Sequence, residues 1–272
     1  MVHPIRVRAR RCRVRGGRHP PRPDAPGRDG VDVTRASHPQ STLDEPRRTA
    51  TTTRSSDLAT KREIWRFLFT RPSARVLAVS ITVLATARVL VGDFGRGDAI
   101  AIVVTLAITG TVEWVIHKYL LHAPLDSWTT RKLGTGTGHH RHHLDPTDVE
   151  WLLLGGLDAA VFVTMFGFVT AAWSMPLMWV TGSSVTGGFF TAWLLTAIGL
   201  LHYEFVHLMV HTRYRPRTRF YRGLARHHRL HHFRNEHYWL GVTSNTGDRL
   251  LRTLPKRKID VPLSDTARTL GQ

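Results

Sequence analysis

The sequence predicts an all-α, polytopic membrane protein with about four transmembrane helices. Four apolar stretches approach the roughly 20 residues that a helix needs to cross a bilayer. They lie at about residues 74–91, 99–121, 151–173 and 187–210. The basic residues flank these stretches: of 38 Lys and Arg, 18 fall in residues 1–75 and 14 in residues 212–272. This distribution is typical of a membrane protein, so the net charge of +18 does not indicate a nucleic-acid partner.

The chain divides into three predicted parts. Residues 1–62 are rich in Arg, Pro, Gly, Thr and Ser without an apolar period, which predicts a disordered basic arm. Residues 63–255 form the predicted membrane domain, and residues 256–272 a C-terminal tail. Cys12 is the single cysteine, which excludes a disulfide within one chain and a cysteine-based zinc site.

The predicted spans differ in clarity. Arg75 and Arg88 interrupt the first, and we expect both to snorkel from its ends. The third is ambiguous where it ends, because apolar residues continue past Pro176 to Val180. The stretch "VTGSSVTGG" (180–188) then predicts a turn before the fourth span. A soluble helical protein with buried helices is the alternative interpretation of the same stretches.

The charge of the connecting loops predicts the orientation. Four spans place both termini on one side of the membrane. The two short connections on the other side, residues 92–98 and 174–188, together contain a single Arg. Since basic residues are retained on the cytoplasmic side, we expect both termini, and the loop 123–150 with them, to be cytoplasmic.

Histidines gather at this predicted cytoplasmic side. Of 17 histidines, 14 lie between His117 and His237. The sequence "EWVIHKYLLH" closes the second span and "HYEFVHLMVH" closes the fourth. The clusters "GHHRHHLDP" and "RHHRLHHFRNEH" follow these two spans in turn. Each of two membrane helices therefore delivers a pair of histidines and is followed by a cluster.

The spacing of the histidines predicts shared helix faces. His207 and His211 are four residues apart and lie on one face of a helix. In the pattern H-x-x-H-H, all three positions lie within about 100° on a helical wheel. It occurs twice, at His139, His142 and His143, and at His228, His231 and His232. His117 and His122 are five apart, so they either address two metals or converge through a bulge.

These ten neutral imidazoles are too many for one tetrahedral ion with four ligands. They suit two metal ions with five or six ligands each, which predicts a cytosolic, histidine-rich di-metal cap on the bundle. Imidazole accepts Fe, Zn, Cu or Ni, so the ligands do not identify the metal. A metal transporter is the main alternative from another class, but it would place ionisable groups along a path through the membrane.

The four histidine motifs resemble those of the fatty acid hydroxylase/sterol desaturase superfamily, with its pattern H-x4-H, H-x2-HH, H-x3-H and H-x2-HH. The resemblance covers about residues 110–255 and includes the stretch "HYWLGVTSNTGDRL" after the last motif. It implies two iron ions as cofactors, with dioxygen and external electrons as co-substrates. Zinc can replace iron in isolated protein, because it stands higher in the affinity order of divalent metals.

The resemblance also implies a membrane lipid as substrate and a separate electron donor of the ferredoxin or cytochrome type. We expect hydroxylation, with a fatty acyl chain favoured over a carotenoid. Desaturation of a lipid or sterol within the same superfamily is the alternative. Cells with and without the protein would differ in lipid oxygen content in the first case and in unsaturation in the second.

Two acids and four further histidines are predicted to surround the ligands. Glu113 precedes His117 by four residues, and Glu204 precedes His207 by three. We expect each carboxylate to accept the N–H of its histidine; for Glu113 the alternative is a polar residue at a helix interface. The remaining histidines are predicted to be neighbours of the ligands or surface groups: His140, His202, His227 and His237.

Overall fold

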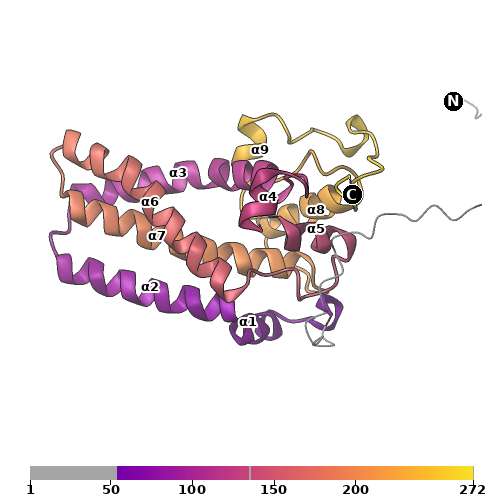
Figure 1. Cartoon of the computed structure of the whole chain (residues 1–272), viewed down its shortest axis with the longest axis horizontal. Helices are drawn as coiled ribbons and strands as arrows, with labels where there is room; N and C mark the ends of the chain where they lie inside the picture. Colours follow the sequence, from indigo (N-terminus) through magenta and orange to yellow (C-terminus); the bar gives the residue numbers. More distant parts are fainter. Residues whose placement is uncertain (1–53, 135, 272) are drawn as a thin grey trace, which may run out of the picture. The chain divides into compact units, whose positions relative to one another are not determined.

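The computed structural model describes residues 54–134 and 136–271, so most of the predicted arm lies outside the described residues. Within them the chain is helical and forms no strand, apart from an isolated bridge between Arg54 and Asp148. The all-α class is therefore confirmed (Figure 1). The α-helices are α1 (Lys61–Thr70), α2 (Pro72–Val91), α3 (Arg96–Ile116), α4 (Trp128–Leu133), α5 (Thr137–Leu144), α6 (Gly156–Val180), α7 (Val185–Val210), α8 (Arg219–Phe233) and α9 (Thr246–Leu250).

Four helices are long and apolar enough to cross a membrane: α2, α3 with its continuation to Leu121, α6 and α7. The predicted number of spans is confirmed. Helix α7 lies at the centre of the bundle and packs against the other three, while α5, α8 and α9 gather at one end (Figure 1). This end holds the histidines.

Small residues allow the spanning helices to approach closely, as is usual in membranes. A Cβ atom on Gly167 of α6 would lie 2.6 Å from the ring of Trp193 on α7. The indole N–H of Trp193 donates to the carbonyl of Val163 on α6 at 3.0 Å. The contact between α6 and α7 is thus fixed by shape and by one directed hydrogen bond.

Arg88 does not snorkel, contrary to our expectation. Its side chain is buried and forms an ion pair with Asp98 at 2.7 Å. Asp98 also caps the start of α3 by accepting the N–H of Gly95 at 2.8 Å, and Arg88 donates to Thr191 of α7 at 2.8 Å. A partly buried carboxylate therefore satisfies the guanidinium, and Arg88, Asp98 and Thr191 join three spanning helices at the end opposite the histidines.

The third span lies further along the chain than we predicted. Helix α6 runs from Gly156 to Val180 and passes through Pro176, which membrane helices tolerate because neighbouring groups can satisfy the freed carbonyl. The apolar residues 151–154, which we placed in the span, precede the helix, and Leu152 and Leu153 are buried in the core. Their hydrophobicity reflects burial in protein.

The last part of the predicted arm is structured. Residues 55–57 form a 3-10 helix, and Arg54 reaches Thr147 with a hydrogen bond of 2.8 Å. Thr60 and Glu63 form a capping box at the start of α1. The buried side chains of Ile64 and Leu68 then pack α1 into the main hydrophobic core.

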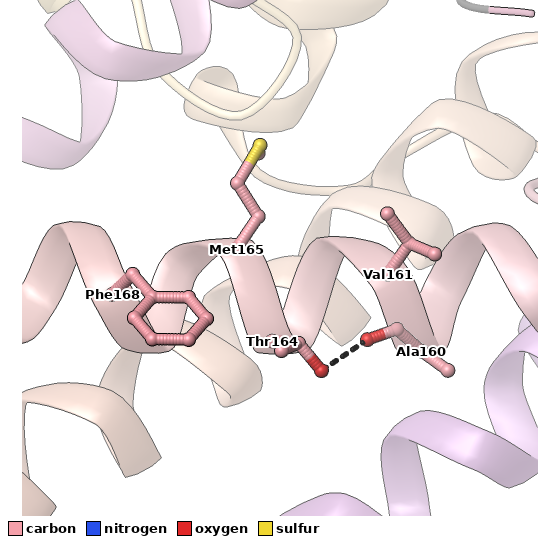
Figure 2. A pocket seen from close by; sticks show the side chains of 5 residues that line it. All are labelled: Ala160, Val161, Thr164, Met165 and Phe168. Carbon is pink, nitrogen blue, oxygen red and sulfur yellow. Dashed lines mark hydrogen bonds between the residues drawn. The ribbon is translucent and has the colours of Figure 1, made fainter. Parts of the chain in front are cut away.

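The surface of α6 carries a shallow apolar pocket lined by Ala160, Val161, Thr164, Met165 and Phe168 (Figure 2). The hydroxyl of Thr164 donates to the carbonyl of Ala160 in its own helix, at 2.9 Å. The hydroxyl proton of Thr164 is therefore used within its own helix. Phe168 is 75% exposed, as expected of a side chain that faces lipid tails.

Candidate metal centre

Both H-x-x-H-H motifs form helices, as predicted. The first occupies α5 and the second the last two turns of α8, and all six histidines of the two motifs are buried. His207 lies in the last turn of α7, and His211 is the residue at which that helix ends. The spacing of each motif thus places its three histidines on one buried helix face.

The two histidines at the end of the second span converge through a π-helical turn, one of the two options that the spacing left open. Residues 117–121 are π-helical, and the N–H of His122 donates to the carbonyl of His117 at 3.1 Å. A turn closed by i to i+5 hydrogen bonds brings residues five apart onto one face. The ring centroids of the two histidines are 4.8 Å apart.

The ten predicted ligands form two groups of five. In each group, one ring nitrogen from every histidine lies within 4.8 Å of the others. The first group is His117, His122, His139, His143 and His231, and the second is His142, His207, His211, His228 and His232. No further group of this kind occurs among the described residues.

Helices α5 and α8 each contribute to both groups, in a reciprocal way. In α5, His139 and His143 enter the first group and His142 the second. In α8, His228 and His232 enter the second group and His231 enters the first. The H-x-x-H-H motif therefore allows one helix face to contribute histidines to two neighbouring groups.

The distances between facing ring nitrogens fit metal ligands. Two ligands bound at about 2.05 Å lie roughly 2.9 Å apart at a right angle and roughly 3.4 Å apart in a tetrahedron. The Nε2 atom of His139 lies 3.1 Å from Nε2 of His117 and 3.1 Å from Nε2 of His122. In the second group, Nε2 of His228 lies 2.8 Å from that of His211 and 3.1 Å from that of His232.

Main-chain carbonyls fix the orientation of four of these rings. The Nδ1 atom of His117 faces the carbonyl of Leu240, and that of His143 lies 2.8 Å from the carbonyl oxygen of Ala267. The Nδ1 atom of His207 lies 2.9 Å from the carbonyl oxygen of Leu152, and that of His231 lies 2.9 Å from that of Tyr238. A neutral imidazole has one N–H, so this bond leaves the lone pair on Nε2. The buried Nε2 atoms of His143, His207 and His231 have no hydrogen-bond partner among the described residues. The residues present thus fit a bound metal.

Glu113 and Glu204 do not accept the N–H of a ligand histidine, so that prediction is wrong. Glu113 accepts the main-chain N–H groups of Val242 and Thr243, while Glu204 accepts the hydroxyl of Ser73 at 2.7 Å and the N–H of Leu154 at 3.3 Å. The reason is that the rings of His117 and His207 already give their single N–H to carbonyls. The carboxylates instead hold the segments that carry those carbonyls.

Asp248, which the sequence did not single out, has the same role. It accepts the N–H groups of Leu240 at 2.9 Å and Gly241 at 2.8 Å, and the hydroxyl of Thr253. Thr253 in turn accepts the indole N–H of Trp114 at 2.8 Å. Burial raises the pKa of Asp248. This network fixes the loop after α8 against α3, where its carbonyls meet the histidines.

Burial keeps the histidines of the centre neutral. Outside the spanning helices, burial and the neighbouring imidazoles hold the pKa of six of them well below the ordinary value: His139, His142, His211, His228, His231 and His232. Burial lowers the pKa of His143 to about 3. A neutral ring presents the lone pair that a metal requires.

The four remaining histidines lie outside both groups, as predicted. The Nε2 atom of His140 bonds to the carbonyl of Ala123 at 2.9 Å, and that of His202 to the hydroxyl of Tyr221 at 3.1 Å. The Nδ1 atom of His227 bonds to the amide oxygen of Asn245 at 3.1 Å. His237 is exposed, 3.5 Å from the carboxylate of Glu236.

A bundle of four membrane-length helices with ten histidines in two groups at one end defines a class: membrane proteins whose histidine clusters could hold two metal ions. The fatty acid hydroxylase family model matches residues 102–253, which is more than half of the chain. The chain belongs to the fatty acid hydroxylase family and is an integral membrane protein.

Three curated relatives show modest identity. The chain is 25% identical to the dihydroceramide fatty acyl 2-hydroxylase FAH1 of Arabidopsis thaliana, over 60% of this chain and 65% of that protein. It is 25% identical to FAH2 of the same plant, over 54% of this chain and 59% of that protein. It is 30% identical to the beta-carotene hydroxylase of Paracoccus sp. (strain PC1), over 48% of this chain and 72% of that protein. No solved structure matches the chain significantly.

Proposed function

We propose that the protein is an O2-dependent, non-haem di-iron hydroxylase of a membrane lipid. One observation carries this proposal: two adjacent groups of five histidines, four of them buried in each group, lie at the end of the membrane bundle. We assign the ten histidines as ligands, five to each ion. When bound, two irons supply the activation of dioxygen that no amino-acid side chain provides. Five ligands from the protein leave room for an exogenous ligand at each ion.

The side chains and main chain around this centre hold the ligands and exclude water. The main-chain carbonyls of residues 152, 238, 240 and 267 keep the proton of four rings on Nδ1. Glu113, Glu204 and Asp248 hold the loops that supply three of these carbonyls. Four of the five histidines in each group are buried, which limits competing reactions with bulk water.

The substrate that we favour is a fatty acyl chain, and we place the site at the cytoplasmic end of the spans. Such a site reaches a carbon near the headgroup more readily than one in the middle of the chain. Two of the relatives named above are fatty acyl 2-hydroxylases, which supports this choice, and the third acts on a carotenoid. Electrons would come from a separate ferredoxin or cytochrome-type donor.

Mass spectrometry of lipids from cells with and without the protein tests the proposal. The matched control is the His142→Ala variant, which removes one ligand. We expect acyl lipids that gain one oxygen only with the intact protein, and labelling of that oxygen from 18O2. Loss of two hydrogens without added oxygen would make the protein a desaturase. An unchanged lipid profile in cells that supply a reductase and dioxygen would contradict an enzymatic role.

A further inference from the structure

The residues after α9 pack onto the ends of α5 and α8. We define residues 258–270 as the C-terminal segment; it lies on the histidine side of the bundle and passes beside α8 (Figure 1). Val261 and Ala267 of this segment are buried. It lies beyond residues 102–253, which the family model matches. The family match therefore says nothing about its role.

One set of contacts anchors the segment to the end of α8. Arg234 donates to the carbonyl of Val261 at 2.8 Å, and the carbonyl of Arg234 accepts the N–H of Ser264 at 2.8 Å. One carboxylate oxygen of Glu236 accepts the hydroxyls of Ser264 at 3.0 Å and Thr266 at 2.5 Å. Although burial opposes it, these hydroxyls keep the pKa of Glu236 below its ordinary value, so the anchor is charged.

A second set of contacts joins the segment to α5. Arg268 donates to the carbonyl of Leu144 at 2.9 Å, and its guanidinium lies 5.8 Å from the ring centroid of Phe233. The carbonyl of Ala267 accepts the Nδ1–H of His143 at 2.8 Å. The segment thus bridges the two helices that carry the H-x-x-H-H motifs, and its one bond to a predicted ligand is to His143.

We propose that the C-terminal segment is a working part of the first metal site, with the Ala267 carbonyl as the positioning group that holds the His143 ring with Nε2 facing the other four histidines. The proposal rests on the metal centre proposed above. The other three carbonyls that fix ligand rings come from residues 152, 238 and 240, within the matched region. Only this one is supplied from outside it.

The two groups should depend on the segment unequally. His143 belongs to the first group, and among the described residues no hydrogen bond joins the segment to a histidine of the second group. Without the Ala267 carbonyl, the His143 ring can exchange tautomers and rotate, and water can reach it. Loss of an outer partner of this kind weakens metal binding about 10- to 100-fold. The weakening should be confined to one of the two ions.

Truncation tests this inference with purified protein loaded with Zn2+. A chain ending at Arg257 lacks the segment, and a chain ending at Arg268 is the matched control because it keeps the Ala267 carbonyl. Zinc content and its release to a chelator are measured for both and for the full chain. We expect the control to resemble the full chain, and the shorter chain to release one ion about 10- to 100-fold faster while holding the other.

A milder variant serves if the shorter chain does not fold. Replacing Ser264 and Thr266 by Ala removes the anchor on Glu236, and Asp265→Ala, at an exposed position between them, is its control. In a His143→Ala background, neither change should accelerate zinc release further. Equal release from all chains, or equally faster release of both ions, would overturn the inference.

This measurement is separate from the test of hydroxylation. Zinc release needs neither dioxygen nor lipid turnover. If the segment controls one ion but no lipid is oxidised, the proposed hydroxylation fails and the role of the segment stands. If the chain ending at Arg257 holds both ions and hydroxylates lipid at the full rate, the role of the segment fails and the proposed function stands.

Discussion

The partner that the Nε2 atom of each histidine faces separates the proposed ligands from their neighbours. His140 and His142 lie two residues apart in α5, and both are buried. The Nε2 atom of His140 bonds to a main-chain carbonyl, whereas Nε2 of His142 lies 3.1 Å from Nε2 of His232. Burial and residue type are therefore alike, and only the direction of the ring on the helix differs.

We expect His142→Ala and His140→Ala to differ sharply. His142→Ala removes a ligand, so it should lower turnover more than the 10- to 100-fold typical of an outer partner, and metal content should fall with it. His140→Ala removes no ligand from either group, although it removes the hydrogen bond to the carbonyl of Ala123, so it should change activity only a few-fold. Metal analysis and single-turnover rates check both. If His140→Ala abolished turnover while His139→Ala left it unchanged, the assigned register of α5 would be wrong.

Glu113 gives a second prediction at the residue scale. Glu113→Ala leaves the main-chain N–H groups of Val242 and Thr243 without acceptors, and each such loss in a buried place costs about 1–3 kcal/mol. The variant should lower the free energy of unfolding by about 2–4 kcal/mol and weaken metal binding through His117. Glu113→Gln keeps an acceptor oxygen and should lose less than half as much. Equal losses would mean that the charge, and not the acceptor, holds the loop.

At the scale of elements, the sequence predicted helices and registers better than it predicted their partners. Histidine is a distinctive residue type, so its spacing identified α5, α8 and the end of α7. The partners of the rings are main-chain carbonyls, which every residue carries, so no residue type at positions 152, 240 or 267 marks them. The start of the third span was wrong for a related reason: residues 151–154 are apolar because they support the histidine end.

The contact between α3 and α9 depends on a glycine. A Cβ on Gly247 would lie 2.5 Å from the carbonyl oxygen of Gly110 and 2.5 Å from Cβ of Trp114, and main chain cannot easily give way. Gly247→Ala should therefore lower the free energy of unfolding by about 1–3 kcal/mol. It should also loosen metal binding, because Asp248 is the next residue and holds Leu240.

Gly223→Ala in α8 is the matched control. Nothing lies within 4 Å of the Cβ that this change adds. Alanine is favoured over glycine inside a helix by about 1 kcal/mol, so the variant should be as stable as the parent or slightly more stable. Thermal unfolding of the two variants in the same detergent gives the comparison. A destabilised Gly223→Ala beside an unaffected Gly247→Ala would contradict the close packing of α9.

At the scale of the whole molecule, the buried histidine centre links stability to pH. In the folded protein the pKa of His143 is lowered to about 3, and six other ring pKa values are shifted the same way. In the unfolded chain they are about 6.5. Between these values the unfolded chain binds protons that the folded protein does not. The contribution of these histidines to the free energy of unfolding is therefore fully present above a pH of about 6.5 and is lost progressively as the pH falls.

The metal-free protein should accordingly lose thermal stability steeply between about pH 7 and pH 5, with up to about 1.4 kcal/mol per pH unit for each such histidine. Zn2+ should move this loss to lower pH, because it binds the neutral rings and competes with protons. Circular dichroism melts at a series of pH values, with and without Zn2+, measure both effects. A midpoint that does not change over this range in the metal-free protein would exclude a centre of neutral, buried histidines.

The orientation of the bundle in the membrane gives the last prediction. The connection between α2 and α3 and that between α6 and α7 lie at the end away from the histidines; neither contains Lys or Arg, and Arg96, the first residue of α3, is the one basic residue beside them. The histidine end carries the basic residues of α8 and of the stretch 249–258. Because basic loops stay on the cytoplasmic side, the metal centre should face the cytoplasm, where reduced electron carriers are available.

Two single-cysteine variants in a Cys12→Ser background test this orientation: Asp93→Cys and Lys258→Cys, both at exposed positions. A membrane-impermeant maleimide added to intact cells should label position 93 alone, and both positions after permeabilisation. Labelling of position 258 in intact cells would place the histidine centre on the outside and leave it without the proposed source of electrons.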